Sequence, residues 1–269
     1  MKFAAVRRLL LAGSFLIAEL HCRSAPASDG SLPMASEVMA RVVQRAGDSC
    51  RELEANKYAF EKCSINEELD ASGKPTKTEE KTYEIIPIQG VPFSRLVKIE
   101  NRKLTEEEIR VQNRRETEFR QRLAHKDGDS GGKKNWLDNR VVDRFDFKVE
   151  GRDTFQGRPV LILSFRPKAS RGPARTIEDK VLNRLAGTLW IDEQEAEITR
   201  LNVGLTEDLS LGLFGTIGSL KQFDLKLDRE RLADGVWVTQ KQAVVMSGRK
   251  LFSSIAHRVL EESSNFRKP

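Results

Sequence analysis

Histidine and cysteine are scarce in this chain, and their scarcity removes most of the usual routes to catalysis. The 269 residues include three histidines and three cysteines. His125 and His257 belong to no HExxH motif or comparable pair, and no glycine-rich loop precedes a helix as phosphate binding requires. Carboxylate pairs such as Asp192 and Glu193 fall in turns or at a helix start, where solvation explains them better than acid–base work. The sequence therefore predicts no enzyme, no metal site and no cofactor.

Long apolar runs and a large charge excess are also missing. After residue 27 no stretch is long and apolar enough to cross a membrane, because a transmembrane helix needs about 20 such residues. The net charge is +6, but residues 1–27 carry four positive charges and one negative charge, which leaves about +3 on the remainder. So small a charge does not favour nucleic acid as a partner. No internal repeat of fixed period is visible.

The first 27 residues are typical of a cleavable signal peptide. An apolar run at Leu9–Ala18 follows a positively charged segment, and Ala25–Ala27 supplies the small residues of a cleavage site. An uncleaved anchor and lipidation at Cys22 are the alternatives. We expect export to the periplasm or cell envelope and a mature chain that begins at Ser28.

Two cysteines, Cys50 and Cys63, remain after removal of this leader. An even cysteine count in an exported chain favours a disulfide. Two buried free thiols are the alternative, and a redox-active pair is disfavoured because the spacing is far from Cys-x-x-Cys. We expect the disulfide to tie the N-terminal helical region to the first strand.

A helix is predicted over Pro33–Ala46, because Val38, Val42, Val43 and Ala46 form one apolar stripe at helical spacing. A three-strand meander follows at residues 58–68, 77–88 and 93–100. Thr105 and Glu108 then form a capping box, which opens a charged helix. The sequence thus predicts a helical excursion at about residues 105–142 between two groups of strands.

The stretch Gly187–Ser247 is typical of a longer antiparallel meander. Phe223, Leu225 and Leu227 alternate with polar residues, which is the period of a strand with one wet face. The apolar, glycine-broken segment Leu209–Ile217 is predicted to be a loop. Its contact residues are Leu211, Leu213, Phe214 and Ile217. Since loops are normally polar, this one either tucks into the sheet or contacts a membrane or an apolar ligand.

This order of elements resembles the fold of the outer-membrane lipoprotein-sorting proteins, the family of LolA-type carriers and LolB-type receptors. The motifs that carry the resemblance are Tyr83-Glu84, Pro92–Val97, Lys103–Thr105, Leu185–Asp192 and Asp234–Trp237. The resemblance implies an α+β fold, in which a curved antiparallel sheet forms an incomplete β-barrel covered by helices. It also implies a single domain over residues 28–269, with an apolar cavity that takes lipoprotein acyl chains.

A half-closed barrel leaves a cavity lined by the inward-facing residues of each strand. The residues that we expect to line it are Phe145, Phe147, Val149, Leu201, Val203, Phe223, Leu225 and Leu227. The predicted protein is an exported, monomeric, non-catalytic carrier that holds a lipid or an acyl chain and contacts the membrane peripherally. The alternative is an envelope regulatory or scaffold module that binds a protein partner through the same sheet.

Overall fold

The computed structural model describes residues 31–48, 54–125, 137–170, 174, 176–211, 218–250 and 253–268. Within it, Leu32–Pro269 forms one compact unit. The predicted signal peptide lies outside the described residues, as does Cys50. In the described ranges, no helix has both the length and the hydrophobicity needed to cross a membrane.

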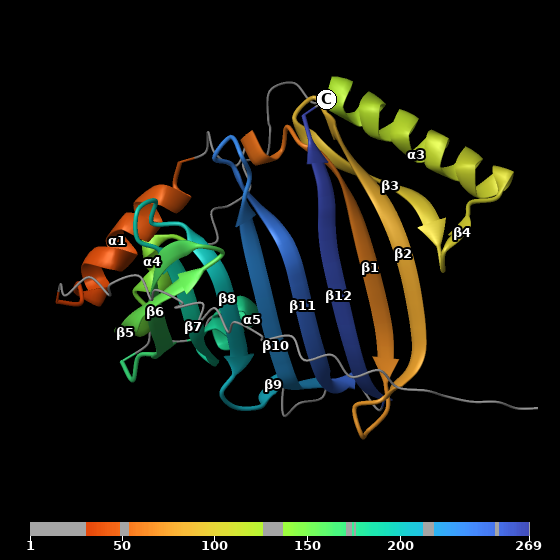
Figure 1. The fold of residues 1–269 in the computed structure, drawn as a ribbon. Helices are drawn as coiled ribbons and strands as arrows, with labels where there is room; N and C mark the ends of the chain where they lie inside the picture. Colours follow the sequence, from red (N-terminus) through yellow and green to blue (C-terminus); the bar gives the residue numbers. More distant parts are fainter. Residues whose placement is uncertain are drawn as a thin grey trace, which may run out of the picture. The chain divides into compact units, whose positions relative to one another are not determined.

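One antiparallel sheet of twelve strands dominates the described part of the chain (Figure 1). The strands are β1 (Ala59–Leu69), β2 (Pro75–Ile88), β3 (Val91–Ile99), β4 (Arg102–Lys103), β5 (Phe145–Phe155), β6 (Arg158–Pro167), β7 (Leu185–Asp192), β8 (Ile198–Leu205), β9 (Leu209–Leu211), β10 (Gly218–Arg231), β11 (Trp237–Lys250) and β12 (Ser253–Arg267). Their order across the sheet is β4, β3, β2, β1, β12, β11, β10, β8, β7, β6, β5, and β9 pairs with β10. Among the described residues the end strands β4 and β5 do not pair, so the curved sheet is unclosed. The predicted fold class is confirmed.

The last strand joins the two halves of the sheet. β12 pairs with β1 on one side and with β11 on the other. Segments from opposite ends of the chain therefore lie side by side in the middle of the sheet (Figure 1). This pairing places residues of the first meander next to residues of the second, which sequence-local patterns cannot reveal.

The described helices lie beside the sheet. They are α1 (Ala35–Ala46), α3 (Glu106–His125), α4 (Asn139–Val142) and α5 (Ile177–Leu182). The predicted capping box of α3 is confirmed: the Thr105 amide donates to Glu108 Oε2 over 2.8 Å, and the Glu108 amide donates to Thr105 Oγ1 over 3.3 Å. The ring of Phe119 lies 5.1 Å from that of Phe93, which packs α3 against β3.

The main core lies between α1 and one end of the sheet. Val38, Met39 and Val42 of α1 are at most 4 % exposed and belong to this core. Their buried partners on the sheet are Leu161, Leu163, Leu189, Ile191, Ile198 and Leu201. Burying one such side chain contributes roughly 1.5–3 kcal/mol relative to exposure, so this contact fixes α1 on the sheet. We call the side of the sheet that α1 covers the α1 face.

The first three residues of the predicted loop Leu209–Ile217 form a strand. In β9, Leu209 lies opposite Leu220 and Leu211 lies opposite Gly218 of β10. Leu209 is only 2 % exposed. Backbone pairing and burial both stabilise the extended conformation here, so the prediction that the loop begins at Leu209 is wrong.

Candidate functional site

The eight residues predicted to line a cavity all lie on the α1 face. One row of directly opposed residues crosses the sheet from β5 to β10 and consists of Val149, Leu163, Leu189, Leu201 and Leu227. Directly opposed residues share a face of the sheet, and so do alternate residues of one strand. By this alternation, the same face carries the other members of the set, namely Phe145, Phe147, Val203, Phe223 and Leu225. The structure therefore brings the predicted set together on one side of the sheet.

Part of this set packs into the core beneath α1. Phe145 and Leu201 are buried. The half-buried members that contact the core are Phe147, Val149, Val203, Leu225 and Leu227. The ring of Phe165 lies 5.3 Å from that of Phe145 and 6.0 Å from that of Phe147. At the β5–β8 end, side chains of the helix and the sheet thus occupy the α1 face.

The apolar row continues beyond this core onto β10, β11 and β12. Its members, each directly opposite the next, are Val203, Leu225, Val244 and Val259. Phe223 lies opposite Met246 on the same face. We call these six residues the apolar strip; all of them are half-buried. Every member of the strip has an apolar side chain, so the row contains no charged group.

Sequence reasoning missed three members of the apolar strip, namely Val244, Met246 and Val259. The run Ala243–Met246 is apolar at every position. Such a run does not alternate, so its inward and outward residues cannot be told apart before the pairing with β10 is known.

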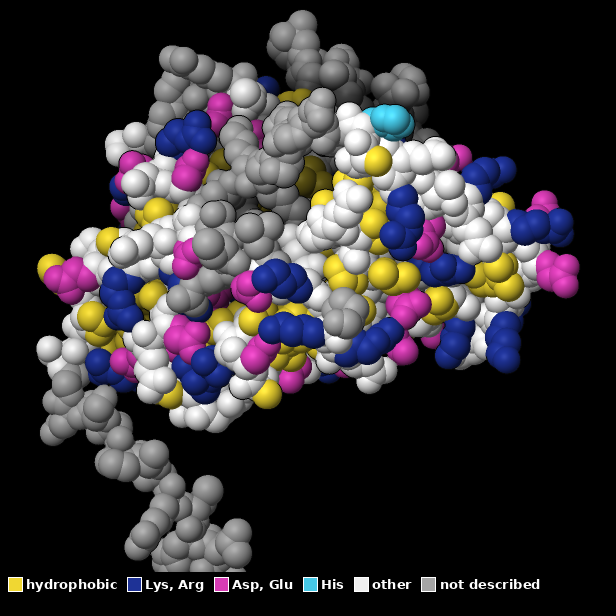
Figure 2. All heavy atoms as spheres, turned by 90° about the horizontal axis from the view of Figure 1, so that it is seen from above, with side chains coloured by type: hydrophobic (Ala, Val, Ile, Leu, Met, Phe, Trp, Pro, Cys, Tyr) yellow, Lys and Arg dark blue, Asp and Glu magenta, His cyan; other side chains and the backbone are white. Residues whose placement is uncertain are grey.

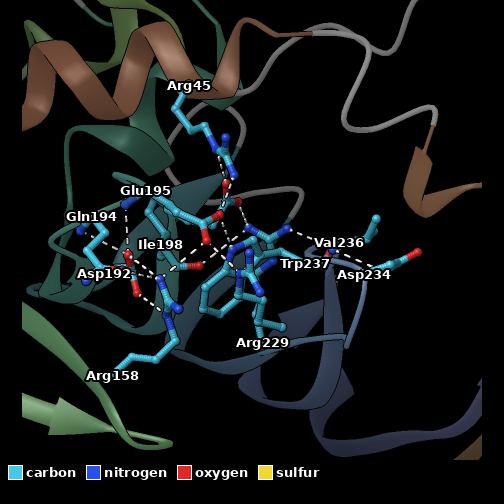
Figure 3. Close-up of polar contacts among 12 residues, drawn as sticks. Arg45, Arg158, Asp192, Gln194, Glu195, Ile198, Arg229, Asp234, Val236 and Trp237 are labelled. Atoms are coloured by element: carbon cyan, nitrogen blue, oxygen red, sulfur yellow. Dashed lines mark hydrogen bonds and ion pairs between the residues drawn. The ribbon is translucent and has the colours of Figure 1, made fainter.

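A network of arginines and carboxylates fixes the C-terminal end of α1 to the sheet (Figure 3). Arg45 donates from Nε to Glu197 Oε2 over 2.7 Å and from Nη2 to Glu195 Oε2 over 3.0 Å. Arg229 also pairs with Glu197, and the indole N–H of Trp237 donates to Glu195 over 3.0 Å. The side chain of Arg45 is only 11 % exposed. Since water screens these ion pairs less than surface pairs, they hold α1 in one position.

Asp192 shapes the turn that carries this network. It is fully buried, and Arg158 donates to its two oxygens over 2.5 and 3.0 Å. The amides of Gln194 and Glu195 donate to Oδ1 over 3.0 and 2.8 Å. Burial alone would raise the pKa of Asp192, but the Arg158 and amide donors outweigh it and leave the pKa below its ordinary value. The carboxylate therefore stays ionised at neutral pH.

A pocket of about 540 Å³ opens on the face of the sheet opposite α1. It is lined by Cys63, Ile65, Trp190, Arg200, Asn202, Lys226, Leu227, Asp228, Lys241, Gln242, Ala243, Leu260, Glu261 and Glu262. Of the predicted cavity residues, only Leu227 borders this pocket. The assignment of the other seven to a ligand cavity stays a prediction. Among the described residues, no group of three or more His, Cys, Asp or Glu side chains is placed to hold a metal ion.

Cys63 carries a free thiol in the structure, so the predicted disulfide with Cys50 is not present there. Burial raises the pKa of the Cys63 thiol, and the carboxylates of Glu80 and Glu262 raise it further. The thiol lies 3.9 Å from Glu80 Oε1. Acidic neighbours on the adjacent strands thus favour the protonated form of the Cys63 thiol at neutral pH. Because Cys50 lies outside the described residues, its pairing with Cys63 stays a prediction.

The predicted contacts of the apolar loop fall mostly outside the described residues. Leu211 ends β9, and its side chain is not among those described; Leu213, Phe214 and Ile217 lie beyond the described ranges. Their contact with a membrane or ligand stays a prediction. On the surface that Figure 2 shows, basic and acidic side chains are interspersed, with no broad region of one sign.

No family model and no curated protein matches the chain. Solved structures similar to it include an outer membrane lipoprotein-sorting protein domain from Vibrio parahaemolyticus, at 9% identity and a TM-score of 0.28, covering 85% of this chain and 92% of that one. A LolA superfamily protein from Nitrosomonas europaea matches at 6% identity and a TM-score of 0.29, covering 88% and 94%. The MucA/MucB complex of Pseudomonas aeruginosa matches at 10% identity and a TM-score of 0.23, covering 82% and 94%. The neighbours thus include the kinds of protein that the sequence resembles, but identities and scores this low carry no assignment of function.

Proposed function

We propose that this chain is an exported, non-catalytic carrier that holds an apolar ligand, such as a lipid or an acyl chain, on the α1 face. The observation that carries the proposal is the apolar strip, which extends the core row across β8, β10, β11 and β12. Its six residues are half-buried rather than buried, so they retain surface that a ligand can cover.

The dimensions of the elements support this location. With a rise of about 1.5 Å per residue, a helix as short as α1 is roughly 18 Å long and covers only a few strands. The buried sheet residues that pack with α1 lie on β6, β7 and β8, whereas the apolar strip continues for roughly 14 Å across β8, β10, β11 and β12 at about 4.8 Å per strand. Each CH₂ group that leaves water against the apolar strip contributes about 0.8 kcal/mol. An acyl chain therefore needs no charged or catalytic group to bind there.

The arginine network holds α1, which covers the β5–β8 end of the α1 face, as a fixed wall at that end. Because Arg45 is held by both Glu195 and Glu197, the C-terminal end of α1 stays on the sheet. A fixed wall lowers the entropic cost of binding, since fewer groups must be ordered when the ligand arrives.

Two valines on β11 provide a matched test. Val244 belongs to the apolar strip. Its neighbour Val245 points to the opposite face, where it lies between Asp224 and Arg258. The two valines are both half-buried. We expect Val244→Asn to weaken binding of dansyl-labelled undecanoic acid about tenfold, because a polar group replaces apolar contact. Val245→Asn should leave the affinity unchanged. Equal affinities of the two variants would contradict the proposed site.

Native mass spectrometry of protein purified from its own envelope separates the carrier from its alternative. A co-purifying lipid that Val244→Asn loses would support the carrier. A stoichiometric protein partner with no lipid would favour a regulatory or scaffold module that uses the same face. Export itself is tested by N-terminal sequencing, which should begin at Ser28.

A further inference from the structure

The pocket on the face opposite α1 is lined by fourteen residues. Eleven of them form two rows of directly opposed residues, and Leu227, Gln242 and Glu261 form the row between the two. The first row contains Trp190, Arg200, Asp228, Lys241, Glu262 and Cys63. The second contains Asn202, Lys226, Ala243, Leu260 and Ile65. Both rows are one residue out of step with the core row through Leu201 and Leu227. Their side chains therefore point away from α1 and from the apolar strip.

One wall of the pocket is held rigid by an aromatic and ionic stack. Arg200 donates to both oxygens of Asp228, over 2.7 and 2.9 Å. Its guanidinium group lies 4.4 Å from the ring centre of Phe155 and 5.8 Å from that of Trp190. A bidentate ion pair stacked on aromatic rings loses little entropy when a ligand binds beside it.

The charges of the pocket leave one cation without a counter-ion. Arg200 is neutralised by Asp228, and Lys241 lies 3.1 Å from Glu262. Glu261 is paired with Lys62 over 2.9 Å. Lys226 is exposed and has no ion-pair partner in the described part of the chain. Its direct neighbour across the strands is Asn202, whose amide adds an uncharged donor.

The other side of the same row is apolar. Ala243, Leu260 and Ile65 follow Lys226 on β11, β12 and β1, and all three are half-buried. A ligand that pairs with Lys226 therefore meets an apolar surface on the next three strands and the ring of Trp190 on the strand beyond Arg200. The volume of about 540 Å³ lies in the range of small-molecule sites.

We propose that this pocket binds a small organic molecule that has one anionic group and an aliphatic or aromatic body. The anion pairs with Lys226 beside Asn202, and the body lies over Ala243 and Leu260. This site is separate from the apolar strip, because the two occupy opposite faces of the sheet. It does not depend on the proposed carrier function.

Phenylbutyrate and its alcohol analogue phenylbutanol are the probes that test the charge requirement. By calorimetry, Lys226→Gln should weaken phenylbutyrate binding about fivefold, the effect of losing an exposed ion pair, and leave phenylbutanol binding unchanged. Lys221→Gln is the control, because Lys221 is an exposed lysine of the same strand that does not line the pocket. Equal effects of Lys226→Gln on the two probes, or equal effects of the two lysine variants, would overturn anion recognition by Lys226.

The position of the ligand is tested with the thiol in the first row. Bound phenylbutyrate should slow the alkylation of Cys63 by iodoacetamide, as measured by peptide mass spectrometry, because Cys63 lines the pocket. Ala243→Leu fills the apolar side of the pocket and should weaken both probes at least tenfold. An unchanged alkylation rate at saturating phenylbutyrate would refute the site, and so would undiminished binding to a folded Ala243→Leu variant.

Discussion

Replacing Asp192 by asparagine tests whether the buried carboxylate organises the turn that holds α1. Asparagine has nearly the same volume, and its Oδ1 can still accept from the amides of Gln194 and Glu195. Its Nδ2 group, however, faces Arg158, which donates to the second oxygen of the native carboxylate over 2.5 Å. The substitution therefore replaces an ion pair by two opposed donors and leaves the charge of Arg158 less well paired.

The expected cost is about 3 kcal/mol of unfolding free energy. Removing one partner of a buried ion pair costs about 3–5 kcal/mol when the other charge is left uncompensated. The lower end applies, because Arg158 is 25% exposed and keeps a contact of 3.3 Å with Glu195. For a domain of this size, about 3 kcal/mol corresponds to a decrease in Tm of roughly 6–12 °C.

Urea and thermal unfolding of Asp192→Asn at neutral pH measure this effect, with Asp208→Asn as the control. Asp208 is exposed and should change Tm by less than about 1 °C. The folded pKa of Asp192 lies below its ordinary value of 3.8, so its contribution is present above that pH and is lost as the pH falls through the folded pKa. The gap between wild type and variant should therefore close in acid. A decrease in Tm as small as that of Asp208→Asn would refute the reasoning.

Two further predictions concern the packing of the core and the loss of stability at low pH. Met39→Ala should lower the unfolding free energy by about 2–5 kcal/mol because Met39 is 2 % exposed, whereas Met34→Ala, at 63 % exposure, should have almost no effect in the same urea titration. Hydrogen bonds from Lys268 and Tyr58 lower the pKa of Asp234 from 3.8 to about 2, so the stability contributed by this carboxylate should be lost between about pH 4 and pH 2. A carbon-detected NMR titration that places the pKa of Asp234 near 4 would contradict this assignment.

The sequence predicts elements well where the signal is local. The period-two pattern around Phe223 and Leu225 predicts a strand over Leu220–Asp228, and β10 covers this segment with a few more residues at each end. The capping box of Thr105 and Glu108 also forms as predicted, since its hydrogen bonds join residues three positions apart. Such features need only the chemistry of neighbouring residues.

The pairing between distant strands is what local patterns cannot supply. β12 must pair with β1 before Leu260 lies beside Ile65, and no motif in either strand specifies this partner. The pocket opposite α1 depends on that pairing and was therefore not predicted. The burial of Met39 is not predicted for a similar reason, because packing against the sheet determines which side of α1 is buried. Ala46, which the sequence assigns to the apolar stripe, is exposed.

Gly187 tests how closely two strands of the core must approach. A Cβ atom at this position would lie 2.0 Å from the carbonyl oxygen of Asn202 and 3.0 Å from Cα of Val203. These are backbone atoms of β8, which pairs with β7 in the middle of the core row, so the clash cannot be relieved by rotating a side chain. We expect Gly187→Ala to cost at least about 1–3 kcal/mol, the usual range for overpacking.

Gly151 is the matched control for this substitution. It also lies in a strand of the sheet, but no atom comes within 4 Å of its added Cβ. Gly151→Ala should be neutral or stabilise the protein by about 0.5–1 kcal/mol, because alanine loses less backbone entropy than glycine on folding. If urea unfolding gives the two variants equal stability, β7 and β8 can separate without cost. The close approach of β7 to the backbone of β8 at Gly187 would then not be required for the fold.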